Sequence, residues 1–325
     1  MFRPFFLALL GAALLPAPRA FAQSVKVLPY LQRIAGPKTL AGQHNKEPNA
    51  EPTKWTDYVA ETTGKYPALW SGDFLFQQEN IDNRWKMVKE AERQYRQGAV
   101  INIMWHACPP AAGEPCGWDP GLLNQLLTDA QWRELTTDGT PLNKTWKSRM
   151  DDIAVYLQYL KEKKVEVLFR PLHEMNQGKF WWGGRPGPQG TARLYQITHD
   201  YLAKTKGLTN LVWVWDMQDM SRDFAAYNPG DKYWDVFAFD VYDKGYDQSW
   251  YDYIRPIVGR KPMAIGECEK LPTPAVLASQ PRWVFFMSWA ELVQEKNSVD
   301  ALKTLYNDPR VLTRDELPGW TSKSK

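Results

Sequence analysis

The sequence predicts a single catalytic domain with an α/β fold, a (β/α)8 TIM barrel. Its 325 residues allow either two ordinary domains or one large barrel. Hydrophobic residues make up 44% of the chain and charged residues 24%, which excludes a disordered or fibrous protein. Eight short apolar runs alternate with amphipathic helical stretches, and no linker or internal repeat separates them. This alternation favours a closed parallel barrel whose strands are covered on both faces.

The eight expected strands are apolar, β-branched or aromatic runs bounded by turn residues. They are Lys38–His44, Tyr66–Phe74, Ala99–His106, Val165–His173, Leu211–Trp215, Asp235–Tyr242, Pro262–Glu267 and Trp283–Trp289. A doubly wound sheet is the main competing fold. It usually has a Gly-rich turn after its first strand, and the sequence from Ala41 to His44 is not such a turn.

Four helical stretches carry apolar residues three to four positions apart. Asp82 can cap the first stretch and Gly98 can end it, while Gly207 ends the third. The apolar stripes are Trp85, Val88, Ala91 and Tyr95; Met150, Ile153, Ala154, Leu157 and Leu160; Leu194, Ile197, Tyr201 and Leu202; and Val299, Leu302, Leu305 and Tyr306.

Residues 1–22 have the pattern of a secretory signal peptide. Arg3 is followed by an apolar run from Phe5 to Leu15, which is too short to span a bilayer, and Ala20 to Ala22 fits the A-x-A cleavage pattern. We therefore expect residues 23–325 to form the catalytic domain of a protein secreted to the extracellular space or periplasm. We expect no membrane partner after cleavage. The formal net charge is +3, and the absence of a basic stripe gives no support for a nucleic-acid partner.

The three cysteines suggest one disulfide. Cys108 and Cys116 lie in the long segment from Ala107 to Asn143, and an exported context permits them to pair. Cys268 is then expected to be a buried free thiol. The long segment itself is predicted to be an elaborated loop that forms a wall of the site.

Polar residues collect where the expected strands end, which is where barrel enzymes carry their chemistry. Three of the four histidines, His44, His106 and His173, end a strand. The fourth strand runs through Arg170 directly into His173 and Glu174. Charged groups at the end of an apolar strand must be paired or functional.

A second acid, Glu267, ends the seventh strand. Its separation from Glu174 is 267 − 174 = 93 residues, or three βα units, so the two acids face each other across the barrel mouth. Two carboxylates roughly 5–5.5 Å apart can hydrolyse a glycosidic bond with retention, one as acid/base and one as nucleophile. Glu269 is the rival for the second role, but the apolar run ends at Glu267.

The 16 tryptophans suggest a sugar ligand, because indoles stack on the apolar faces of sugar rings. Trp55, Trp85, Trp132 and Trp146 look helical and are expected to pack. Five others lie at or just beyond strand ends and are expected to line a cleft: Trp105, Trp181, Trp182, Trp215 and Trp289. We expect no metal and no cofactor, since His173 and Glu174 lack the second histidine of H-E-x-x-H.

These residues resemble glycoside hydrolase family 26, a clan-A barrel family best known for endo-β-1,4-mannanases. The resemblance covers nearly the whole mature chain, and its most specific part is the string from Arg170 to Asn176. In that string His173 stands where most clan members have asparagine. Further matches are Trp105-His106, the segment from Asp235 to Tyr242, and Glu267 and Trp289.

The resemblance implies a role for each matching residue. Glu174 would be the acid/base and Glu267 the nucleophile, oriented by a hydrogen bond from Tyr242. His106, His173 and Trp289 would line the subsite of the attacked sugar, with Trp181 and Arg170 in support. Asp235 and Asp240 match family acids, of which Asp235 has a possible structural role. Lys179 stands where the family often has an aromatic residue, which would alter stacking on the leaving-group side.

The expected function is that of a monomeric, secreted, retaining endo-β-1,4-mannanase acting on mannan, glucomannan or galactomannan. Three alternatives stay open at this point. The same carboxylates can serve a hydrolase of mixed-linkage β-glucan or β-1,3-xylan. A non-catalytic carbohydrate-binding barrel and a metal hydrolase are the other two.

Overall fold

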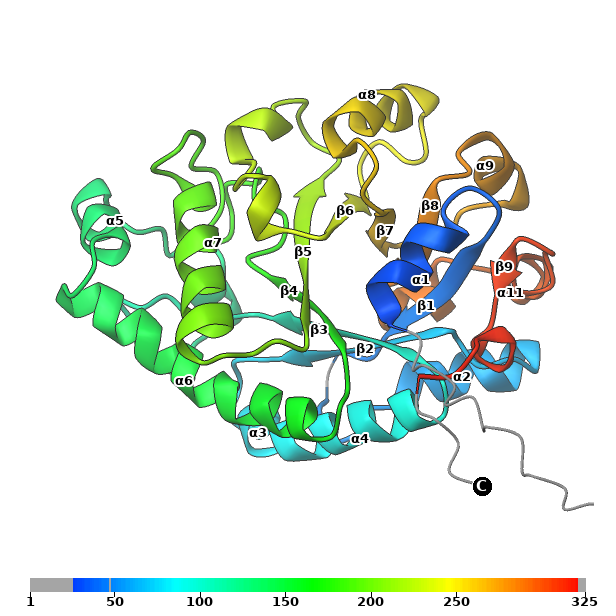
Figure 1. Cartoon of the computed structure of the whole chain (residues 1–325), viewed down its shortest axis with the longest axis horizontal. Coiled ribbons are helices and arrows are strands. Elements are labelled where there is room, and N and C mark those ends of the chain that lie inside the picture. The colour runs from blue at the N-terminus through cyan, green and yellow to red at the C-terminus, as the bar shows by residue number, and fades with distance from the viewer. Residues whose placement is uncertain (1–25, 47, 321–325) are drawn as a thin grey trace, which may run out of the picture.

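The predicted (β/α)8 TIM barrel is confirmed by a computed structural model that describes residues 26–46 and 48–320. All eight expected strands are present, each parallel to its neighbours, and β1 pairs with both β8 and β2, which closes the barrel. Helices surround the strands (Figure 1). The expected signal peptide at residues 1–22 lies outside the described residues. Within the described ranges, no helix is long and apolar enough to cross a membrane.

The barrel strands overlap the runs predicted for them, with ends that differ by at most three residues. They are β1 (Thr39–His44), β2 (Leu69–Phe74), β3 (Val100–Trp105), β4 (Val167–Pro171), β5 (Leu211–Gln218), β6 (Val236–Val241), β7 (Met263–Cys268) and β8 (Trp283–Ser288). A short ninth strand, β9 (Val311–Leu312), pairs with β1. Two residues give no periodic signal, so β9 could not be predicted.

The helices lie between the strands and in the loops above them. They are α1 (Val27–Ile34), α2 (Lys54–Thr63), α3 (Gln78–Asp82), α4 (Arg84–Arg96), α5 (Asp129–Thr136), α6 (Pro141–Glu162), α7 (Thr191–His199), α8 (Gln248–Val258), α9 (Pro274–Ser279), α10 (Leu292–Glu295) and α11 (Val299–Tyr306). Shorter helical turns are η2 (Asp200–Thr205), η3 (Phe224–Tyr227), η4 (Asp231–Tyr233) and η5 (Arg314–Glu316). The segment η1 (Trp118–Leu122) has non-helical backbone angles at Asp119, Pro120 and Gly121.

The predicted apolar stripes lie on α4, α6 and α11 and across α7 and η2, because α7 ends at His199 and Tyr201 and Leu202 belong to η2. Two further corrections apply. Asp82 does not cap α4, because it is the last residue of α3 and Asn83 occupies the N-cap position. Trp85 and Val299 are 45% and 46% exposed, so they do not join the buried stripes of α4 and α11. Gly98 does end the α4 region, with a φ of +101° that favours glycine.

The predicted disulfide between Cys108 and Cys116 is present, and Cys268 is a buried free thiol. The loop that carries the disulfide is joined to the loop after β4. The backbone N–H of Trp181 donates to the carbonyl of Leu122, and an isolated bridge pairs Leu123 with Phe180. These two loops therefore form a single braced wall at the carboxyl ends of β3 and β4.

Candidate active site

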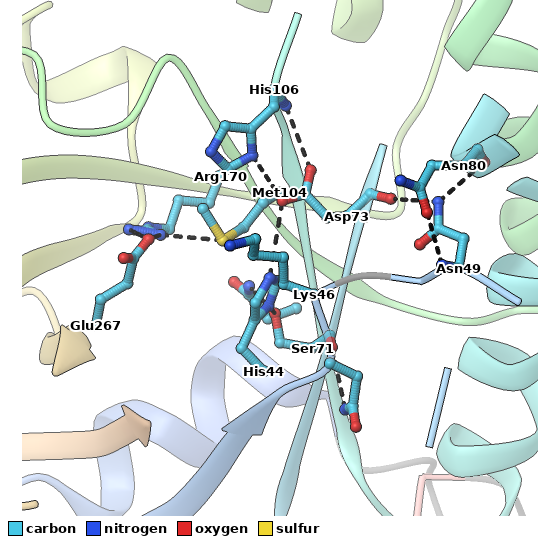
Figure 2. Close-up of polar contacts among 12 residues, drawn as sticks. His44, Lys46, Asn49, Ser71, Asp73, Asn80, Met104, His106, Arg170 and Glu267 are labelled. Atoms are coloured by element: carbon cyan, nitrogen blue, oxygen red, sulfur yellow. Dashed lines mark hydrogen bonds and ion pairs between the residues drawn. The ribbon is translucent and has the colours of Figure 1, made fainter. Parts of the chain in front are cut away.

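Arg170 lies at the centre of a buried carboxylate cluster inside the barrel. From β4 its Nε donates to Asp216 at 3.0 Å, and Nη2 donates to Asp240 at 2.5 Å. Both terminal nitrogens donate to Oε1 of Glu267 at 2.6 Å, and Figure 2 shows the guanidinium turned toward that carboxylate. Burial alone would lower the pKa of Arg170, but the three carboxylates raise it well above its usual value. The arginine is thus a permanent cation beneath the site.

A bulge in β7 aims Glu267 at this cluster. The pairing of β6 with β7 shifts between Phe239 and Asp240, so that Gly266 is the extra residue between two paired positions. A Cβ atom on Gly266 would come within 2.6 Å of an oxygen of Asp240 and 2.8 Å of one of Asp216. Only glycine fits there, and its presence lets the carboxylates gather around Arg170.

Glu174 and Glu267 meet across the barrel mouth. Carboxylate oxygens of Glu174, Glu267 and Asp240 all lie within 4.8 Å of one another. The separation of Glu174 from Glu267 fits the roughly 5–5.5 Å of a retaining glycosidase better than the wider gap of an inverting one. Three such oxygens can also attract a metal ion, but Arg170 already donates to two of these three carboxylates.

The two glutamates have different partners. Glu267 accepts from Arg170 and, at its Oε2, from the Tyr242 hydroxyl at 2.6 Å, so the hydrogen bond implied by the resemblance is present. Glu174 accepts from the side-chain amide of Gln177. Burial raises the pKa of Glu267 to about 7, against the lowering effects of Arg170 and Tyr242. Burial, followed by the charges of Glu267 and Asp216, raises the pKa of Glu174 well above its usual value.

The backbone that carries Glu174 is strained. Leu172 and Glu174 have φ values of +52° and +50°, in the left-handed region that side chains other than glycine rarely adopt. The backbone N–H of Glu174 donates to Asp216 at 2.7 Å. Asp216 therefore fixes both the acid's backbone and Arg170. Sequence reasoning missed it because the fifth strand was expected to end at Trp215, one residue earlier.

Three histidines share the same end of the barrel. His106 Nδ1 lies 2.6 Å from Oδ2 of Asp73, and His44 Nδ1 lies 2.7 Å from the hydroxyl of Ser71 (Figure 2). The His173 ring centroid lies 4.6 Å from that of His106. Burial, and then the charge of His106, lowers the pKa of both His44 and His173 well below its usual value. These two rings are therefore neutral near pH 7.

The expected tryptophan cleft is only partly present. Met104 and Asp216 contact Arg170 inside the barrel, so alternation along the strands turns Trp105 and Trp215 outward. Trp105 stacks on Trp146 of α6 at 4.7 Å. The prediction that Trp105 and Trp215 contact a sugar is therefore wrong.

Trp181 and Trp182 are also fully buried, so they cannot stack on a sugar ring. Their indole N–H groups donate to the carbonyls of Ala107 and His173, at 2.7 Å and 2.8 Å. They brace the residues behind the site. Trp289 is 9% exposed and its ring stacks on that of His44 at 4.3 Å.

Other candidates lie away from the carboxylates or were missed. Asp235 precedes β6 at the opposite end of the barrel and accepts from the backbone of Trp213. Glu269 lies 3.9 Å from Lys296, outside the carboxylate cluster. Lys179 is exposed beside the site. Trp118, which no strand-end pattern could reveal, is 46% exposed, and its ring centroid lies 6.2 Å from that of His106.

The chain matches the family described as glycosyl hydrolase family 26 over residues 17–316. It is 34% identical over 318 residues to a mannan endo-1,4-beta-mannosidase of Thermothelomyces thermophilus, an alignment that covers 93% of this chain and 63% of the relative. A mannan endo-1,4-beta-mannosidase of Bacillus subtilis is 27% identical, over 82% of this chain and 77% of its own. The chain thus spans less than two thirds of the length of the Thermothelomyces relative.

Solved structures resemble the whole barrel. GH26A from a Muricauda species has a TM-score of 0.84 and 35% identity, over 89% of this chain and 95% of that one. A beta-mannanase from a symbiotic protist of the termite Reticulitermes speratus, complexed with gluco-manno-oligosaccharide, has a TM-score of 0.77 and 28% identity. That alignment covers 90% of this chain and 93% of the protist chain.

Proposed function

The chain belongs to glycosyl hydrolase family 26, and on this premise we propose that it is a secreted, retaining endo-β-1,4-mannanase. The observation that carries the proposal is the pair of buried carboxylates, Glu174 and Glu267, with oxygens within 4.8 Å and contrasting partners. The names of the relatives indicate mannan as the substrate. The signal-peptide pattern of residues 1–22 supports secretion.

The first step uses the contrast between the two acids. Glu267 is the group with a cationic partner, so it is the one that ionises first and attacks the anomeric carbon. Glu174 keeps its proton to higher pH and donates it to the departing glycosidic oxygen. The C–O bond to the leaving sugar breaks as the bond from Glu267 to the anomeric carbon forms.

The second step reverses the role of Glu174. Having lost its proton, it takes one from a water molecule, which attacks the anomeric carbon and releases Glu267. Two displacements leave the product with its original anomeric configuration. His106, His173 and Trp289 surround the attacked sugar, while Arg170, Asp240 and Trp181 hold the groups that touch it.

A substrate panel tests the activity. Mannan, glucomannan, galactomannan, mixed-linkage β-glucan and β-1,3-xylan are incubated with the full chain, and the products are separated by chromatography. We expect oligosaccharides from the three mannans, and chelator should not change the rate. Products from β-glucan or β-1,3-xylan alone would overturn the proposal that mannan is the substrate. Binding without any product would indicate a carbohydrate-binding barrel.

Chemical rescue tests the two roles. Glu174→Ala and Glu267→Ala should each nearly abolish turnover, and azide should restore part of it on an activated aryl mannoside. The Glu267→Ala variant should give the azide of inverted configuration and the Glu174→Ala variant the retained one. Glu269→Ala is the matched control and should keep parental activity. Equal products from both variants would refute the assignment.

A further inference from the structure

A surface groove lies between the loop after β1 and a face of α4, outside the carboxylate cluster. It has a volume of about 750 Å3, within the range of ligand pockets. One wall is the segment of residues 50–54, which follows β1, and the other is a face of α4 with Trp85, Lys86 and Lys89. We call it the α4 groove. None of its lining residues takes part in the proposed reaction.

Trp85 presents a fixed aromatic surface in the α4 groove. Its side chain is 45% exposed, which is high for a residue type that is normally well buried. Tyr156 and Tyr159 of α6 hold the ring by edge contacts, with centroids 4.8 Å and 5.4 Å away. A ring that is both exposed and held in place offers contact area at little entropic cost.

The opposite wall is pinned to the interior of the barrel. Asn49, which precedes the wall, is held by three hydrogen bonds. Its backbone N–H donates to the side chain of Asn80 at 2.8 Å. Its amide donates to the carbonyls of Asp73 and Asn80 at 3.2 Å and 3.1 Å (Figure 2). The carbonyl of Pro52 accepts from the indole of Trp70 at 2.9 Å. The groove is therefore preformed.

The α4 groove carries hydrogen-bond donors and acceptors of both charges, namely Lys54, Lys86, Lys89 and Arg93 together with Glu51 and Glu90. Arg93 is paired with Glu90 at 2.6 Å, and the ammonium of Lys89 donates to the Tyr159 hydroxyl at 2.6 Å. Glu51 adds an acceptor on the facing wall. A flat apolar ring edged by both donors and acceptors matches a sugar, which has apolar C–H faces and a rim of hydroxyls.

We propose that the α4 groove is a second carbohydrate site, which binds a stretch of β-1,4-mannan chain by stacking a sugar ring on Trp85. The inference rests on the proposed function, because the occupant is the same polysaccharide. The position of the groove supports this choice. Its wall follows the carboxyl end of β1 and is tied to Asp73, the residue that also contacts His106 of the catalytic site. A polymer held there stays close to the catalytic end of the barrel.

Binding by a hydrolysis-deficient protein tests the site. Full-length Glu267→Gln is titrated with mannohexaose by calorimetry and adsorbed to insoluble β-1,4-mannan. We expect two classes of site in Glu267→Gln and one in Glu267→Gln/Trp85→Ala, with adsorption weakened by about threefold to tenfold. Trp85→Phe keeps a ring and should retain most of the adsorption. Val155→Ala, at an exposed apolar position of α6, is the control for unspecific surface effects.

The outcomes separate the groove from the catalytic proposal. A single class of site in the parent, or unchanged adsorption after Trp85→Ala, would overturn the groove while leaving the hydrolysis of mannan by the wild-type chain intact. Adsorption that depends on Trp85 in a chain without mannan hydrolysis would support the groove and overturn the function. Melting temperatures equal to that of Glu267→Gln would show that the Trp85 variants are folded. If Trp85→Ala is unfolded, the groove is tested by the adsorption of Trp85→Phe and by the number of binding sites in Glu267→Gln.

Discussion

The Nδ1 nitrogen of His106 lies 2.6 Å from a carboxylate oxygen of Asp73, with both side chains buried. A second oxygen of the same carboxylate accepts from the His106 backbone at 3.3 Å. A carboxylate only accepts, so it keeps the imidazole proton on Nδ1 and turns Nε2 outward. Asp73 thereby sets both the tautomer and the orientation of a ring that we propose lies beside the attacked sugar.

Replacing Asp73 by asparagine should disturb that ring without changing its size. The amide can present an N–H to Nδ1 and so favour the opposite tautomer, and the loss of a charged hydrogen bond corresponds to about a tenfold to hundredfold fall in kcat/KM. Steady-state kinetics on mannohexaose measures kcat/KM, and Asp82→Asn, at an exposed position, is the control. Parental kinetics in Asp73→Asn would show that the carboxylate has no positioning role.

Tyr242→Phe should shift the acidic limb of the pH–rate profile upward. The hydroxyl lowers the pKa of Glu267, which stands at about 7, so its removal raises that pKa and leaves less ionised nucleophile at a given pH. The pH dependence of kcat/KM reports the change. Tyr246→Phe removes a hydroxyl bonded to the carbonyl of Lys270 instead, and its profile should match the parent. An unmoved limb in Tyr242→Phe would contradict the orienting role.

Glu174→Gln should raise the melting temperature even as it abolishes turnover. Burial raises the pKa of Glu174 above its ordinary 4.5, so the folded state binds this proton more tightly than the unfolded state does. Glu174 therefore costs the wild-type protein stability as pH rises above about 4.5, and the glutamine variant lacks this one contribution. Thermal unfolding from pH 4 to 8 should show a gain that grows with pH. The exposed Glu295→Gln is the control, and a gain largest at low pH would refute the argument.

Removing the disulfide should loosen the wall that carries Trp118. Cys108 and Cys116 enclose a short loop, for which the chain-entropy estimate is about 2–3 kcal/mol of stability. In Cys108→Ala/Cys116→Ala we expect lower thermal stability and a higher KM for long mannooligosaccharides, with kcat less affected. Cys268→Ala, which removes the free thiol, serves as the comparison. A fall in kcat alone would place the effect on chemistry and not on the wall.

The barrel could be predicted from the sequence because each strand is a continuous apolar run. Such a run is still recognised as a strand when its ends are misjudged by a residue or two. The site residues at strand ends followed from that frame. Asp216 shows the limit, since it lay one residue beyond the expected end of its strand. Asp73 was visible as an acid within an apolar run, a signal that could have been read in the same way as Glu267.

The tryptophans could not be assigned from their positions along the chain. Alternation decides whether a strand residue faces the barrel interior or the helices, and an error of one residue reverses the answer. Trp105 and Trp215 were misplaced for this reason. Trp85 was misplaced for a different reason. The helical period identifies the buried face of a helix, but it does not tell how far a large ring at the border of that face is exposed.

The cluster around Arg170 has one further consequence. One guanidinium faces Asp216, Asp240 and Glu267, so the acids outnumber the cation that binds them. Burial raises the pKa of Asp240 well above its usual value and that of Glu267 to about 7, so the buried cluster resists the ionisation of all its acids at once. The transition state of glycosidic cleavage resembles an oxocarbenium ion, whose positive charge is absent from the resting substrate. In the proposed mechanism that positive charge offsets the burial cost of the ionised carboxylates only while the bond is breaking, so the same buried acids that destabilise the empty barrel lower the barrier to reaction.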